Sequence, residues 1–133
     1  MSEAVEQETL FDWIHIKRIK WPELDLAWHT PNGGSRNKVE AARLKAQGVK
    51  KGVPDVFLAI PKNGYHGLFI EMKRTQGGKV SPEQETMLQR LNEQGYKAVV
   101  CKGWQAAARM IEDYMTGRLA CGEGDGAFTA GNR

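Results

Sequence analysis

This chain of 133 residues has little cysteine, no long apolar run and no strong excess of charge. Its two cysteines, Cys101 and Cys121, are too few for a disulfide framework and lack the spacing of a zinc site. The longest apolar stretches fall far below membrane-spanning length, and the acidic N-terminus is unlike a secretion signal. We therefore expect a protein of the reducing cytoplasm.

The net charge of +3 is too small to indicate a nucleic-acid partner by itself. Basic residues nevertheless gather over 36–51, where Glu40 is the one acid, and again over 73–79. Such clusters provide phosphate contacts, helped by backbone N–H groups of Gly-rich segments. The alternative is a solvated basic face. The residues predicted to bind nucleic acid are Asn32, Arg36, Lys38, Arg43, Lys50, Lys51, Arg74 and Lys79.

Two short apolar runs, roughly 54–60 and 67–73, flank a turn that contains Pro, Asn and Gly. Runs of this length and composition, separated by such a turn, predict a β-hairpin. The hairpin would bring Asp55, at the start of the first strand, beside Glu71 and Lys73, at the end of the second. Because side chains alternate along a strand, Glu71 and Lys73 share one face.

Two carboxylates at the edge of an apolar sheet are costly unless something holds them, and a divalent metal is the simplest explanation. Asp55 and Glu71 supply hard oxygen ligands that suit Mg²⁺ or Mn²⁺, and the Met72 carbonyl adds a third. Such an ion polarises a phosphate oxygen and activates water, while Lys73 would stabilise the developing charge. The pattern predicts metal-dependent phosphodiester cleavage. The alternative is that Asp55 caps a turn and that Glu71 and Lys73 form an ion pair.

The surrounding motifs make the pattern more specific. They are Lys51-Gly-Val-Pro-Asp55, Ile70-Glu-Met-Lys73, Ser81-Pro-Glu-Gln84, Pro31-Asn-Gly-Gly34 and Glu3-x-x-x-Gln7. This combination resembles the VRR-NUC family of the PD-(D/E)xK nuclease superfamily, including its small stand-alone phage and bacterial members. The resemblance implies a metal-dependent nuclease in a bacterial or phage-infected cell. Some stand-alone members are homodimers that act on branched DNA, such as four-way (Holliday) junctions.

Two further site residues rest on this resemblance. Gln84 stands three residues after Ser81, which is the capping-box position, and the resemblance adds a role in the site. In the resembled pattern, an acidic residue of the first helix completes the metal or water shell. Glu3 has the required four-residue spacing to Gln7, although Glu6 and Glu8 compete for the role. The alternative for Glu3 is a solvated helix start.

The periodicities predict an α/β domain over 1–116 and a flexible Gly-rich tail over 117–133. The order is helix, strand, helix, two strands, helix, strand and helix. With the second helix treated as an insertion, this order matches the restriction-endonuclease-like αβββαβ core of the resembled superfamily, a mixed sheet flanked by helices. The expected helices lie at about 3–20, 38–47, 81–94 and 104–115, and the strands outside the hairpin at 24–30 and 96–101.

The sequence and the resemblance together predict a homodimeric Mg²⁺- or Mn²⁺-dependent endonuclease for branched or duplex DNA. Two other classes stay open. The chain would be a catalytically silent DNA-binding module if its carboxylates held no metal, or an interaction protein if its basic loop bound acidic partners.

Overall fold

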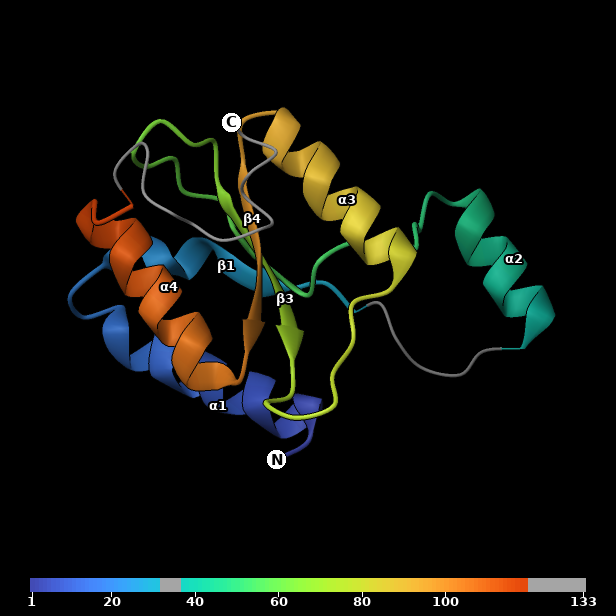
Figure 1. The fold of residues 1–133 in the computed structure, drawn as a ribbon, viewed down its shortest axis with the longest axis horizontal. Helices are drawn as coiled ribbons and strands as arrows, with labels where there is room; N and C mark the ends of the chain where they lie inside the picture. Colours follow the sequence, from blue (N-terminus) through green and yellow to red (C-terminus); the bar gives the residue numbers. More distant parts are fainter. Residues whose placement is uncertain (32–36, 120–133) are drawn as a thin grey trace.

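In the residues that the structure describes, four strands form one mixed sheet with helices on both faces (Figure 1). The structure is a computed structural model, and it describes residues 1–31 and 37–119. In spatial order the strands are β1 (Ala27–His29), β2 (Val56–Leu58), β3 (Leu68–Lys73) and β4 (Lys97–Lys102). Strand β2 pairs antiparallel with both β1 and β3, and β4 runs parallel to β3.

Helices α1 (Glu3–Lys17) and α4 (Trp104–Thr116) pack against each other and cover one face of the sheet. Leu10 and Ile14 of α1 and Ile111 of α4 are buried in this core. The strand residues of the same core alternate in sequence, as expected for one face of a pleated sheet. They are Val56, Leu58, Leu68, Ile70, Met72, Val99 and Cys101.

Helix α3 (Pro82–Glu93) connects β3 to the parallel strand β4 and packs against β4. Its Asn92 is buried, and the side-chain amide accepts from the Ala98 N–H at 3.0 Å and donates to the Ala98 carbonyl at 2.9 Å. The strand residues that alternate with those of the core belong to the other face of the sheet. Among them, Phe57 stacks on Phe69 with ring centroids 4.2 Å apart. By the same alternation, Asp55, Glu71 and Lys73 belong to this second set of residues.

The expected α/β fold with its αβββαβ core is confirmed, but three of its elements have other bounds than expected. One is the first hairpin strand, expected at 54–60, which spans only Val56–Leu58. Helix α1 ends at Lys17 rather than near residue 20, and turns follow it. The residues expected to begin the first strand form a 3₁₀ helix, η1 (Pro22–Leu26), so that β1 has only three residues. Pro22 at the first position of η1 favours a helical turn over a strand. The turn also buries Leu24 in the core.

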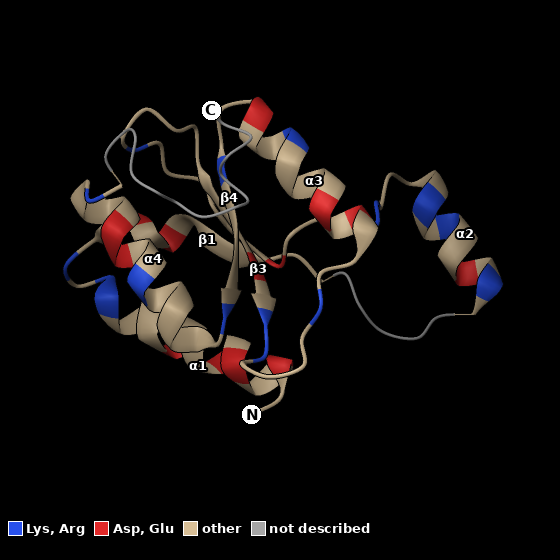
Figure 2. Ribbon diagram, viewed as in Figure 1, with Lys and Arg blue, Asp and Glu red and all other residues tan. Residues whose placement is uncertain are grey.

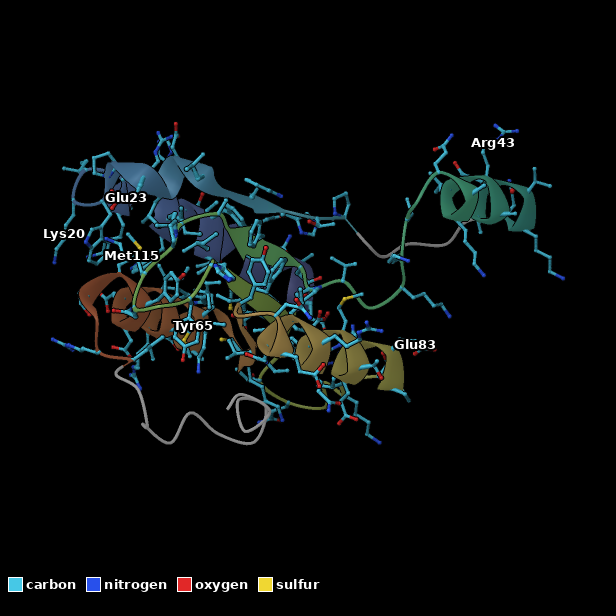
Figure 3. All side chains as sticks on the ribbon, turned by 90° about the horizontal axis from the view of Figure 1, so that it is seen from above. Lys20, Glu23, Arg43, Tyr65, Glu83 and Met115 are labelled. Carbon is cyan, nitrogen blue, oxygen red and sulfur yellow. The ribbon has the colours of Figure 1, made fainter. Side chains whose placement is uncertain are left out.

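Helix α2 (Lys38–Ala46) is separate from the rest of the fold. It has no buried residue, and Figure 1 shows it apart from the sheet and the other helices, as does Figure 3, where Arg43 is labelled on it. Its boundaries agree with the expectation, since the Asn37 side chain accepts from the Glu40 N–H at 2.7 Å. This arrangement agrees with treating α2 as an insertion into the core.

The remaining expectations concern the ends of the chain. Helix α4 closes at Gly117, whose φ of +82° suits glycine. Most of the tail expected over 117–133, with Cys121, lies outside the described residues, whereas Cys101 is buried. None of the helices in the described ranges is long and apolar enough to cross a membrane.

Candidate active site

The pairing of β2 with β3 brings Asp55 and Glu71 together. Val56 pairs with Ile70 at the end of the antiparallel ladder, so Asp55 comes one residue before this pair and Glu71 one residue after it. Asp55 Oδ2 accepts from the Met72 N–H at 2.8 Å, which fixes the carboxylate against β3. The predicted hairpin therefore places its two acids next to each other.

Glu71 and Lys73 are both buried at this end of the sheet, with 3% and 7% of their surface exposed. Lys73 Nζ lies 3.6 Å from Glu71 Oε2, and Gln84 Nε2 donates to the same oxygen at 3.0 Å. A lysine amine and an amide N–H thus point at one carboxylate in a partly desolvated site, where electrostatic interactions are stronger than in water.

Gln84 uses both ends of its side-chain amide. Its Oε1 accepts from the Ser81 N–H at 2.9 Å, and the Ser81 hydroxyl accepts from the Gln84 N–H at 3.1 Å. This is the expected capping box, and it orients the amide so that Nε2 faces Glu71. The cap of α3 and the contact with the site are therefore one structural arrangement.

Burial is the largest cause that raises the pKa of both acids. Desolvation, followed by the negative charge of Asp55, raises the pKa of Glu71 from 4.5 to about 8, although Lys73 opposes the shift. Desolvation also raises the pKa of Asp55, against the hydrogen bond from Met72. The raised pKa favours the protonated form of Glu71 near neutral pH in the metal-free protein. A cation between the two carboxylates would relieve this cost.

The structure distinguishes the acids of α1. Glu6 is buried, and its Oε1 accepts from the Trp104 N–H at 2.8 Å, so it caps the first turn of α4, whose N-cap position is Gly103. Glu3 is exposed, and its charge contributes to raising the pKa of Asp55. Glu3 is therefore close enough for its charge to act on Asp55, whereas Glu6 is engaged in joining α1 to α4.

The hydrogen bond of Glu6 predicts a measurable loss of stability. We expect Glu6→Ala to lower the free energy of unfolding by roughly 1–2 kcal/mol, because α4 loses its N-terminal cap. Urea denaturation measures the loss, and Glu6→Gln, which keeps an acceptor oxygen, should lose less. The control is Glu8→Ala, at an exposed position of the same helix. Equal midpoints for Glu6→Ala and Glu8→Ala would contradict the assignment.

His29 is a neighbour of the site that none of the sequence motifs indicates. Its Nδ1 lies 2.9 Å from the Asp55 carbonyl oxygen, and the Thr30 N–H donates to the same carbonyl at 2.8 Å. The His29 charge lowers the pKa of Asp55, against the dominant effect of burial. Only the pairing of β1 with β2 brings this ring to the site, and no local motif reports that pairing.

The residues predicted to contact nucleic acid lie on three different segments of the chain. Lys38 and Arg43 lie on the separate helix α2, while Lys50 and Lys51 lie between α2 and β2. Arg74 and Lys79 follow Lys73 in the loop before α3, where Figure 2 shows basic residues leading away from β3. Asn32 and Arg36 lie outside the described residues.

The donor set fits a hard divalent cation that keeps several of its waters. Within residues 1–31 and 37–119, no group of three or more His, Cys, Asp or Glu side chains is arranged to enclose a metal ion. Asp55 and Glu71 with the Met72 carbonyl would supply a small set of oxygen ligands. Mg²⁺ is usually bound in this way, by one or two carboxylates together with water and substrate phosphate.

Comparison with known proteins agrees with this geometry. The sequence model of the VRR-NUC domain matches residues 1–105, which include the described site. The chain belongs to the VRR-NUC family. It is also similar to a solved structure described as a VRR_NUC domain protein, with 34% identity and a TM-score of 0.76 over 87% of this chain and 89% of that one. A comparison with curated proteins finds no match. Family membership implies a nuclease-like domain that binds DNA.

Proposed function

We propose that this VRR-NUC domain is a metal-dependent DNA endonuclease that hydrolyses phosphodiester bonds. The observation that carries the proposal is the cluster at the end of β3. Two carboxylates, a buried lysine and an oriented amide meet there in a partly desolvated site. Such a cluster of perturbed acids is expected at functional sites.

In this proposal Asp55 and Glu71 hold Mg²⁺ or Mn²⁺, helped by the Met72 carbonyl. The bound ion supplies Lewis acidity toward a phosphate oxygen and lowers the pKa of water. Glu71 must release its proton before it can act as a ligand, because its pKa is raised to about 8 in the metal-free protein. The Met72 N–H keeps Asp55 oriented through its 2.8 Å hydrogen bond.

The other residues act on water and phosphate. Lys73, whose amine is held beside Glu71, stabilises the nucleophile or the charge that develops on phosphorus. Gln84 positions the water or a phosphate oxygen, and its capping box restricts its rotation. Glu3 completes the shell through water from the exposed start of α1. These groups hold the metal, orient the water and the phosphate, and neutralise the developing charge, which is most of what phosphoryl transfer requires of a protein.

We also propose selectivity for branched DNA, which rests on the small stand-alone VRR-NUC type. No helix-turn-helix or finger motif is present in the sequence to read bases, so shape and phosphate contacts would direct binding. A junction resolvase needs two sites related by a two-fold axis, and therefore a homodimer.

The DNA substrate is tested with labelled four-way junction, flap, duplex and single-stranded DNA, each with Mg²⁺, Mn²⁺ or EDTA. We expect cutting that needs the metal and is fastest on branched DNA, with paired symmetric nicks if the junction is the substrate. Binding without cutting under every condition would favour a catalytically silent DNA-binding module.

The homodimer has a candidate contact on α1 and the turn that follows it. Ile16 and Ile19 are 64% and 89% exposed and line a hollow of about 580 Å³ with Pro22. We expect Ile19→Lys to shift the protein from dimer to monomer, because a charge would enter the buried contact. Light scattering after size exclusion measures the mass. Lys20→Ala, next in the chain, is the control, and a wild-type monomer at high concentration would contradict the dimer.

A further inference from the structure

A groove beside the candidate active site has the charge and shape to hold a nucleic-acid strand. It has a volume of about 650 Å³ and lies between the segment before β2 and helix α3. Its charged residues are Lys50, Lys51 and Arg90 against one acid, Glu83. Among residues 1–31 and 37–119, the ion pairs are formed elsewhere, so these three cations are available to a ligand.

The groove is joined to the site through the first turn of α3. Gly52 has a φ of +87°, and a Cβ added there would lie 2.6 Å from the Glu83 carbonyl oxygen. The basic segment is therefore pressed against the turn from which Gln84 reaches Glu71. Figure 3 shows Glu83 at the end of α3 nearest α2, and Figure 2 shows the basic segment passing this end.

The length and lining of the groove suit the backbone of one DNA strand. Glu83 and Arg90 are seven residues apart on α3, which is about 10 Å along the helix axis. One strand of B-DNA advances about 3.4 Å along the duplex axis per nucleotide, so the two ends of the groove are far enough apart to contact different phosphates of one strand. The exposed Thr86 and the half-buried Met87 line the groove between its charged ends and offer contacts for deoxyribose.

We infer that this groove binds the sugar–phosphate backbone of the DNA strand that leaves the cleavage site, and that Arg90 is a phosphate contact at its far end. The inference rests on the proposed function, because it assumes that DNA is cut beside Gln84. It adds a residue, Arg90, and a strand path along α3. Lys50 and Lys51 act at the end nearer the site.

The test is the salt dependence of DNA binding in EDTA, measured by fluorescence anisotropy with a labelled branched duplex. Removing one phosphate contact lowers the slope of log affinity against log salt by about 0.9. We therefore expect wild type to bind more tightly than Arg90→Ala. The ratio of the wild-type affinity to the Arg90→Ala affinity should fall roughly threefold between about 50 and 200 mM salt. Arg109→Ala, which removes the same charge from an exposed position of α4, is the control.

A second pair of variants adds charge instead of removing it. Thr86→Glu places an acid in the groove and should weaken binding, whereas Gln89→Glu makes the same change on α3 outside the groove lining and should weaken it less. Equal slopes for Arg90→Ala and Arg109→Ala would overturn the inference. The inference would also be overturned if Arg90→Ala weakened binding to polyglutamate but left binding to DNA unchanged, because this would indicate an acidic protein partner. Metal-dependent cleavage by wild type is scored separately, so failure of the groove is distinct from failure of the nuclease.

Discussion

Asp55→Asn is expected to reduce the rate of metal-dependent DNA cleavage by roughly 10³-fold, because the loss of several kcal/mol of charge stabilisation by a metal corresponds to about this factor. The substitution is nearly isosteric. The asparagine Oδ1 can still accept from the Met72 N–H, which Asp55 Oδ2 does at 2.8 Å. The variant therefore removes the charge of a metal ligand while it retains the local hydrogen bond.

Single-turnover cleavage of labelled DNA at saturating protein measures this loss without interference from binding. The stability of Asp55→Asn should equal or exceed that of wild type, because burial raises the pKa of the Asp55 carboxyl. Asp12→Asn, at an exposed position of α1, makes the same change in charge and should cleave normally. Cleavage by Asp55→Asn at the wild-type rate would remove Asp55 from the site.

The metal-free protein is expected to lose stability as the pH rises from about 5 to 8. Burial and Asp55 raise the pKa of Glu71 from 4.5 to about 8 in the folded protein. Between these values the folded state binds more protons than the unfolded state, so the free energy of unfolding falls with increasing pH. At about 1.4 kcal/mol per pKa unit, the loss at pH 8 is on the order of 4 kcal/mol.

Urea denaturation in EDTA across this pH range measures the effect. Glu71→Gln is uncharged at every pH, so its stability should vary less and should exceed that of wild type at pH 8. Calorimetry supplies a second reading, because Mn²⁺ binding at pH 7 should release about one proton from wild type. A flat stability profile for wild type, parallel to that of Glu71→Gln, would contradict the raised pKa.

The hairpin and its acids could be predicted because they depend on short-range patterns. Asp55 directly precedes β2 and Glu71 lies on the next strand in the chain, so alternation of side chains and the antiparallel pairing suffice to bring them together. Gln84 was predictable for a similar reason, since its capping box is local and α3 begins soon after β3. Their roles in catalysis remain predictions.

Other features depend on contacts that no local pattern reports. Glu6 and Trp104 are 98 residues apart in the chain. The sequence therefore does not show that Glu6, rather than Glu3 or Glu8, caps α4. His29 reaches Asp55 only through the pairing of β1 with β2. The expected strand at 24–30 was too long because apolar residues there have strand-like composition, whereas burial of Leu24 in the core favours η1.

The metal site is the central claim, and anomalous diffraction from crystals soaked with Mn²⁺ tests it most directly. We expect a single strong peak between the Asp55 and Glu71 carboxylates, close to the Met72 carbonyl, and its absence from crystals of Asp55→Asn. A peak bound by other residues, or no peak in wild-type crystals at a Mn²⁺ concentration that supports cleavage, would contradict the proposed metal site.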